Sequence, residues 1–267
     1  MTAFCTPFGL FEFNKLPIWI SVGSQGLSRV IDELFADLKG RWLFNFLDDL
    51  VVYSPSIEEH VSHVREVLRR LQEASFTLNP DKLTLGAVEI KYLGHLISPR
   101  GIRVLTDRVT TIQRYPRPSN LSALRRFLGM VGFYAQFIPD FSRRAAPLHA
   151  LKKGAPFRWD DECQSAFDTL KQALCEAPVL QLPDFAKDFV LVTDASDVAV
   201  SAVLHRRVDG QLAPISYYSR LLSPAERRYS TYEKECLLCS LAVINAECTS
   251  STKSSNSTAT TWPCASC

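Results

Sequence analysis

The sequence lacks any apolar run that approaches the ~18 to 20 residues required to cross a membrane. It also lacks the basic and then apolar segments of a secretory signal after Met1. We therefore expect a soluble intracellular protein, cytoplasmic or nuclear, with no membrane partner. Without a secretory route, the eight cysteines are expected to be reduced thiols and not a disulfide framework.

Net charge is also low, +2 over 267 residues, but the charges are segregated along the chain. Residues 100–153 hold eleven Lys or Arg and two Asp or Glu, a net charge of +9, so the other 213 residues sum to −7. Such a basic segment indicates a polyanionic partner, although a solvated basic helical face has the same composition. The hydrophobic content of 46% is enough to build cores for two domains.

Two short apolar runs flank a pair of adjacent aspartates at residues 43–53. This pattern predicts a β-hairpin with Asp48 and Asp49 at its tip. Neighbouring carboxylates repel each other unless a cation or a proton lies between them, and Mg²⁺ prefers oxygen ligands. In polymerases, two such ions roughly 4 Å apart hold the attacking and leaving oxygens. Aspartate pairs in turns are nevertheless mostly structural, so the pair alone does not establish a metal site.

Both helices and strands are predicted along the rest of the chain. Amphipathic helices are predicted over residues 57–74, 121–131, 163–174 and 224–244. Ser56 and Glu59 form a capping box at the start of the helix over 57–74. Strands are predicted over residues 92–97, 189–193, 199–206 and 212–218, with turns at 98–101 and 209–210. Prolines 116, 118, 139 and 147 are expected to divide the basic segment into short helices.

The sequence around the aspartate pair resembles the catalytic hairpin of reverse transcriptases from gypsy-type long-terminal-repeat retroelements, with Phe46-Leu47-Asp48-Asp49 followed by Leu50-Val51-Val52-Tyr53-Ser54. The resemblance continues in order over about 245 residues. The matching segments are His60 with His63, residues 78–82, 92–95 (similar to the family's primer grip), 124–129 with 133–134 and 137–138 (similar to its thumb), 157–159, 177–180, 183–185 and 193–196 (similar to the start of its ribonuclease H domain).

The resemblance implies a mixed α+β fold with a reverse-transcriptase palm, a helical thumb and a truncated RNase H-like domain. The implied divisions are a palm without fingers (1–99), a basic thumb (100–153), a connection (154–185), a partial RNase H-like domain (186–247) and a disordered Ser/Thr-rich tail (248–267). The implied activity is RNA-directed DNA synthesis with cleavage of RNA in hybrids, through carboxylate-held magnesium.

The family's catalytic carboxylates map onto four residues. Asp48 and Asp49 would hold the polymerase metals, and Asp194 and Glu235 would hold the nuclease metals. Glu235 is preferred because residues 234–237 are similar to the family's Glu-Leu-Leu-Ala pattern, and Glu233 stays as the alternative on another side of the helix.

The implied partners are an RNA or DNA template–primer, an RNA–DNA hybrid and other parts of the Pol polyprotein. Contacts to phosphates would be independent of sequence and strongly dependent on salt. The nucleic-acid-binding residues are predicted to be Lys82, Tyr92, Leu93, Gly94, His95, Arg125, Arg126 and Tyr134. The rings of Phe133 and Tyr134 either pack against sugars or fill the core, and the core is favoured.

Other metal sites are disfavoured by the pattern. His60 and His63 are expected on a solvated helical face beside two glutamates. The cysteine pairs 236/239 and 264/267 have zinc-like spacing, but the first pair falls on a predicted helix and the gap between the pairs is featureless.

Departures from the family pattern affect the expected activity. The family's other palm aspartate lies upstream of the first residue here. Trp19 replaces a glycine at a position where the backbone should approach the nucleotide or template closely. Phe46 replaces the usual tyrosine. The family's Asp-Asn strand does not follow Glu235, so we hypothesise a frameshift near residues 237–239. We expect a truncated fragment, inactive or weakly active, because each metal site lacks a carboxylate. The alternative is a non-catalytic nucleic-acid-binding remnant of a decayed element.

Overall fold

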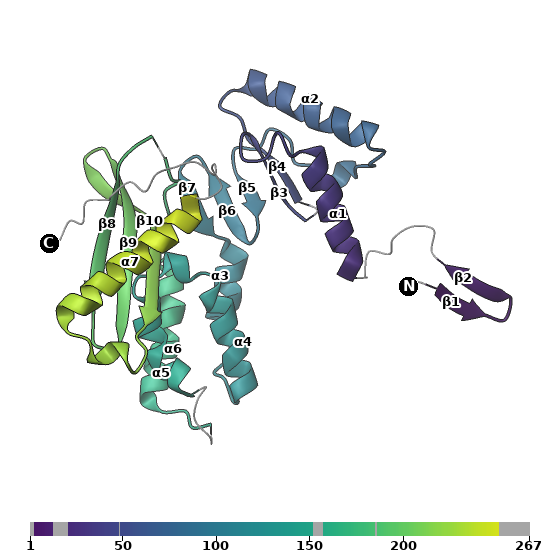
Figure 1. Cartoon of the computed structure of the whole chain (residues 1–267). Helices are drawn as coiled ribbons and strands as arrows, with labels where there is room; N and C mark the ends of the chain where they lie inside the picture. Colours follow the sequence, from purple (N-terminus) through teal and green to yellow (C-terminus); the bar gives the residue numbers. More distant parts are fainter. Residues whose placement is uncertain (1–2, 13–20, 48, 152–156, 185, 251–267) are drawn as a thin grey trace. The chain divides into compact units, whose positions relative to one another are not determined.

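The computed structural model describes residues 3–12, 21–47, 49–151, 157–184 and 186–250, and Figure 1 labels their helices and strands. The fold is mixed α and β, as predicted. It forms two compact units, residues 1–87 (unit 1) and 88–267 (unit 2). The five-part division stays a prediction. None of the described helices has both the length and the apolarity that a membrane span needs.

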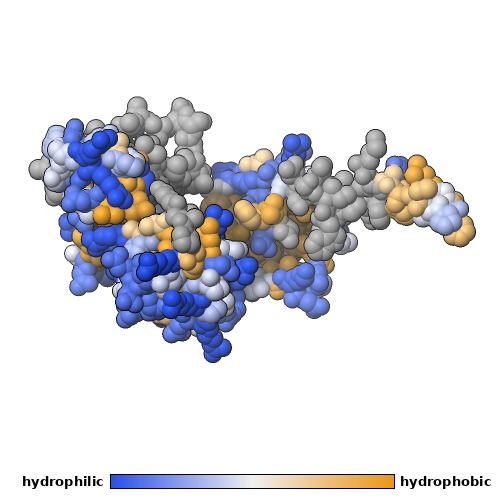
Figure 2. Space-filling model, turned by 90° about the horizontal axis from the view of Figure 1, so that it is seen from below, coloured by the Kyte–Doolittle hydropathy of each residue, from blue (hydrophilic) through white to orange (hydrophobic). Residues whose placement is uncertain are grey.

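Unit 1 consists of two hairpins and two long helices. Its elements are β1 (Ala3–Thr6), β2 (Gly9–Glu12), α1 (Ser21–Leu34), β3 (Leu43–Phe46), β4 (Asp49–Val52), α2 (Ile57–Glu73) and the short η1 (Pro80–Lys82). Its core contains Ile31, Phe35, Leu38, Leu43, Val67 and Leu71. Figure 2 shows apolar side chains exposed on the β1–β2 hairpin, where Phe8 is 91% exposed.

The predicted helix over 57–74 is confirmed as α2, and the Ser56 side chain accepts a hydrogen bond from the backbone N–H of Glu59 at 3.2 Å. Its apolar stripe is only partly buried. Leu71 lies in the core, whereas Ile57 and Val61 remain 64% and 48% exposed. The first apolar positions of the helix therefore stay exposed, while Val67 and Leu71 in its C-terminal half pack in the core.

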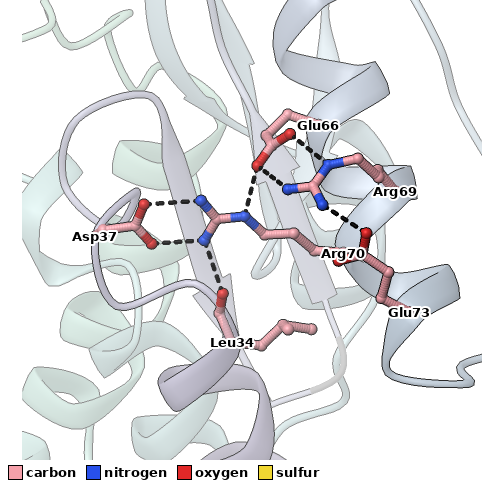
Figure 3. A network of polar contacts seen from close by, with 6 residues as sticks. All are labelled: Leu34, Asp37, Glu66, Arg69, Arg70 and Glu73. Atoms are coloured by element: carbon pink, nitrogen blue, oxygen red, sulfur yellow. Dashed lines mark hydrogen bonds and ion pairs between the residues drawn. The ribbon is translucent and has the colours of Figure 1, made fainter.

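An arginine near the end of α2 joins that helix to the segment that follows α1 (Figure 3). The Arg70 guanidinium donates to both carboxylate oxygens of Asp37, at 2.6 and 2.8 Å, and to the Leu34 carbonyl at 3.0 Å. It also bonds Glu66 at 2.7 Å, and Arg69 donates to the same glutamate. Hydrogen bonds from Arg69 and then from Arg70 lower the pKa of Glu66 to about 2.

Unit 2 begins with a three-stranded meander, continues through helices and ends in a second sheet covered by a helix. Its elements are β5 (Ile90–Tyr92), β6 (His95–Ser98), β7 (Gly101–Val104), α3 (Thr106–Gln113), α4 (Leu121–Gly132), η2 (Ala135–Phe137), α5 (Phe141–Leu151), α6 (Asp161–Cys175), β8 (Phe189–Ala195), β9 (Ala199–Val208), β10 (Gln211–Leu221), η3 (Glu226–Arg228) and α7 (Thr231–Ser250).

Two apolar clusters hold unit 2 together. The larger one lies among α3, α4, α5 and α6 and includes Leu180, while the smaller lies between α7 and the antiparallel sheet β10-β9-β8. The predicted turn at Asp209–Gly210 is confirmed, because Val208 pairs with Gln211 across it. The three predicted strands of this sheet and the helices over 121–131 and 163–174 are confirmed as well.

Three predictions about unit 2 are wrong. The strand expected over 92–97 is a hairpin, because Leu93 and Gly94 both adopt positive φ and form a two-residue turn between β5 and β6. Pro147 does not end a helix but lies inside α5, whose buried Ala145 and Leu148 anchor it on either side of the proline. The last helix begins at Thr231 and not near 224, because Glu226 bonds Arg220 and holds a separate short turn.

The turn predicted at 98–101 is confirmed, and Gly101 is essential to it. Gly101 has a φ of +132°, and a Cβ there would lie 2.1 Å from the Leu180 carbonyl oxygen. The close approach allows Ile102 and Leu180 to exchange two backbone hydrogen bonds of 2.7 and 2.9 Å. A segment about 80 residues further along the chain is thereby fixed to the edge of the β5–β7 meander.

Candidate catalytic and nucleic-acid-binding sites

The hairpin predicted for the aspartate pair is confirmed by the antiparallel pairing of β3 with β4. Phe46 pairs with Asp49, and Leu47, which follows Phe46, has a φ of +54°. Asp48 itself lies outside the described residues. Asp49 is exposed at the first position of β4, and its carboxylate has no hydrogen bond or ion pair within the described part of the chain. Its carboxylate is therefore free to meet a cation.

The two histidines of α2 do not lie on a solvated face, so that prediction is wrong. Both His60 and His63 turn toward Ser54, whose Oγ lies 3.3 and 2.8 Å from their Nδ1 atoms. The His63 ring also stacks on Trp42, with centroids 4.0 Å apart. These contacts fix α2 against the end of β4, the strand that begins with Asp49. No group of three or more His, Cys, Asp or Glu that could hold a metal is found among the described residues.

The turn that resembles a primer grip is held by aromatic side chains that follow α4. The Tyr134 hydroxyl donates to the Gly94 carbonyl at 3.2 Å. His95 stacks between Phe133 and Phe137, with centroid distances of 5.3 and 5.5 Å. Burial lowers the pKa of His95 and raises that of Tyr134. The packing therefore stabilises a neutral imidazole and holds the 93–94 turn against the helical layer.

The rings of Phe133 and Tyr134 differ in how much of their surface is exposed. Tyr134 is 4% exposed, which supports the predicted core role and makes it a positioning residue for the turn. Phe133 is 55% exposed, so the predicted core role is wrong for this ring. In the segment 92–95, which resembles a primer grip, Tyr92 ends β5 and Leu93 lies in the turn that follows.

Helix α4 separates an apolar face from a basic one. The Asn120 side chain caps it by accepting from the backbone N–H of Ala123 at 2.9 Å. Leu124, Phe127, Leu128 and Val131 are buried, whereas Arg125 and Arg126 are exposed and have no ion pair within the described ranges. In unit 1, Lys82 is likewise exposed, at the end of η1.

The two nuclease candidates lie on different elements, Asp194 on strand β8 of the second sheet and Glu235 on helix α7. Asp194 in β8 pairs with Ser201, and both alternate with residues that face α7. Its side chain lines a small pocket with Asp140 and Arg143, at the start of α5. Glu235 is exposed on α7, on the other face of the sheet, and does not line that pocket. Their joint role in a nuclease site stays a prediction.

The alternative glutamate has a structural role in the same helix. Glu233 accepts hydrogen bonds from the backbone N–H and the hydroxyl of Ser230, both at 2.8 Å, and these bonds lower its pKa. Such a reciprocal cap occupies the carboxylate. Between them, Lys234 is buried and bonds Asp197 at 2.8 Å, a pair that the sequence interpretation missed because its partners lie on different elements.

Comparisons with known proteins agree with this arrangement. Residues 1–97 match the family model of reverse transcriptase (RNA-dependent DNA polymerase), and residues 159–250 match that of the RNase H-like domain found in reverse transcriptase. The chain is 34% identical, over 248 residues, to the Retrovirus-related Pol polyprotein from transposon opus of Drosophila melanogaster. It is 35% identical, over 237 residues, to the Transposon Tf2-3 polyprotein of Schizosaccharomyces pombe. The chain carries reverse transcriptase and RNase H-like domains of the kind found in retrotransposon Pol polyproteins.

The chain spans only part of the length of these relatives. Each alignment covers 88% of the chain but 25% of the opus polyprotein and 18% of the Tf2-3 polyprotein. Among solved structures, a foamy viral protease-reverse transcriptase in complex with double-stranded DNA has a TM-score of 0.82 and 24% identity, over 92% of this chain and 43% of that one. A foamy viral protease-reverse transcriptase in complex with an RNA/DNA hybrid has a TM-score of 0.79 and 24% identity, over 92% of this chain and 34% of that one. These likenesses show the fold of the reverse transcriptase.

Proposed function

We propose that this chain is a working part of RNA-directed DNA synthesis in a retrotransposon, acting with other parts of the Pol polyprotein. The observation that carries the proposal is the β3–β4 hairpin, in which Asp49 pairs with Phe46 and presents an exposed carboxylate with no partner among the described residues. Such a carboxylate is costly to leave beside a second aspartate unless a cation binds. The predicted role of Asp48 follows from the sequence.

Magnesium is the ion whose chemistry suits these donors. Asp48 and Asp49 would hold it in the polymerase site, and Asp194 and Glu235 would belong to the RNase H-like site. When bound, the ion supplies charge stabilisation to the reacting phosphate oxygens. Asp49, Asp194 and Glu235 are exposed oxygen donors, which fits a hard cation. With only two carboxylates assigned to each site, each metal shell would be incomplete, so we expect little turnover by the chain alone.

Template–primer binding is the contribution that unit 2 supports best. The exposed Arg125 and Arg126 offer charge to phosphates, and the 93–94 turn, held by Tyr134, offers a fixed backbone in the same unit. Because the contacts are to the backbone of the nucleic acid, they are independent of base sequence. Binding without turnover is the second candidate function, and the +9 charge of residues 100–153 specifically favours it.

The test is primer extension on a homopolymer RNA template with magnesium. Three proteins are compared: the chain itself, Asp48→Asn and Trp19→Gly. Extension that disappears in Asp48→Asn supports a catalytic role for the hairpin. Absence of extension from all three, with salt-dependent hybrid binding intact, supports the binding function alone, and loss of both extension and binding contradicts the whole proposal.

A further inference from the structure

A pocket of about 330 Å³ opens in unit 2 between the 93–94 turn and helices α3 and α4. We call it the Arg108 pocket. Its lining residues are Leu93, Gly94, Arg108, Thr111, Ile112, Met130, Phe133 and Tyr134. The volume falls at the lower end of the range for small-molecule sites, which suits a ligand of one or two rings.

The chemistry of the lining combines an apolar interior with one charge. Ile112 and Tyr134 are buried, Met130 is half-buried and Phe133 presents an exposed ring. Arg108 is exposed, and its guanidinium has no ion pair or hydrogen bond to another of the described residues. The Thr111 hydroxyl already donates to the Asp107 carbonyl at 2.8 Å. The positive charge of Arg108 is thus the dominant polar feature of the pocket.

The walls of the pocket are fixed before any ligand arrives. The Tyr134 hydroxyl is bonded to the Gly94 carbonyl, and the Phe133 ring is stacked on His95. A Cβ at Gly94 would lie 3.3 Å from both Phe133 and the Tyr134 hydroxyl, so a side chain there would intrude. A preformed pocket loses little conformational entropy when it binds.

We propose that the Arg108 pocket binds a small planar aromatic molecule that carries one anionic group. The ring lies against Ile112, Met130 and Phe133, and the anionic group pairs with the Arg108 guanidinium. An aromatic ligand can stack on the Phe133 ring or pack edge-to-face against it. A carboxylate or phosphate can pair with the planar guanidinium of Arg108. A free aromatic acid and a nucleotide of a bound strand share this chemistry. The site does not depend on polymerase activity.

The first probe is 2-naphthoate, and its neutral matched control is 2-naphthylmethanol. Binding to the full chain is measured by titration calorimetry and ligand-observed NMR, together with Arg108→Gln and the control Arg114→Gln, at the C-terminal end of the same helix. We expect one saturable site, with naphthoate about fivefold weaker in Arg108→Gln, as for an exposed charge pair. The neutral ligand should bind both proteins equally, and Arg114→Gln should match the original chain.

A second variant tests the location independently of charge. Thr111→Trp places a large side chain at the rim and should abolish binding of both ligands, while an unchanged unfolding midpoint shows that the fold is intact. Naphthoate binding that is insensitive to Arg108→Gln and Thr111→Trp, or that never saturates at one site, overturns the proposal.

Competition with a template–primer duplex distinguishes the two sources of ligand. Displacement of naphthoate supports a nucleotide as the occupant. Retention of naphthoate beside bound duplex supports a free aromatic acid. Failure of duplex binding contradicts the function proposed above but leaves the naphthoate result intact, so the two failures are separable.

Discussion

Replacing Gly101 by alanine should unfold unit 2 more readily, because the added Cβ has no room. It would lie 2.1 Å from the Leu180 oxygen, well below the ~3.4 Å of a relaxed contact. Moving Leu180 by about 1 Å breaks both hydrogen bonds with Ile102, whose present lengths are 2.7 and 2.9 Å. Their loss costs about 1 to 3 kcal/mol together, and a non-glycine residue at a φ of +132° adds about 1 to 3 kcal/mol.

The sum, about 2 to 6 kcal/mol, is a large fraction of the total stability of ~5 to 15 kcal/mol typical of a domain. The assay is urea unfolding followed by circular dichroism, and Gly129→Ala is the matched control. Gly129 lies in α4, where an added Cβ would meet nothing within 4 Å, so alanine there should stabilise by about 0.5 to 1 kcal/mol. A free-energy loss below about 1 kcal/mol for Gly101→Ala would refute the reasoning.

Four further outcomes follow from the contacts described. Tyr134→Phe should speed amide hydrogen exchange at the 93–94 turn, because the Gly94 carbonyl loses its donor, while fluorescence anisotropy should show weaker duplex binding. Since the pKa of Glu66 is depressed from 4.5 to about 2, its contribution to stability is present above pH 4.5 and is lost as pH falls toward 2; an acid titration of Glu66→Gln should show a shallower decline. Arg125→Gln should reduce the salt slope of duplex affinity by about 1, in anisotropy titrations across salt concentrations. Glu233→Gln should lower the thermal midpoint because it weakens a helix cap, whereas Glu235→Gln should not change it.

Local patterns in the sequence were sufficient for the elements whose signals lie within a few residues. The cap at Ser56, the turn at Asp209–Gly210 and the hairpin around the aspartate pair each depend on neighbours in the chain. The turn at 93–94 was missed because leucine rarely adopts positive φ. There the aromatic residues that follow α4, 40 residues further along, stabilise the turn through tertiary packing.

The candidate sites show the same division. Residue types and their order pointed to the carboxylates, but sequence alone could not predict which face of the sheet each would occupy. Asp194 lines a pocket with Arg143, and Glu235 lies on the helix that covers the other face. The histidines of α2 were misjudged because their partner, Ser54, lies in the loop before the helix, and the sequence does not show that this loop turns back along α2. Contacts between elements determine these outcomes.

The pairing of Ile102 with Leu180 also orders events during synthesis. The meander emerges from the ribosome first, yet the edge of β7 gains its partner only after about 80 more residues have been added. At ~5 to 20 residues per second, that interval lasts roughly 4 to 16 s. Throughout it, the hydrophobic layer of α3 and α4 lacks Leu180, which belongs to the same core cluster. During this interval, the incomplete core of unit 2 is exposed in the nascent chain, where chaperones can bind it and misassembly can occur.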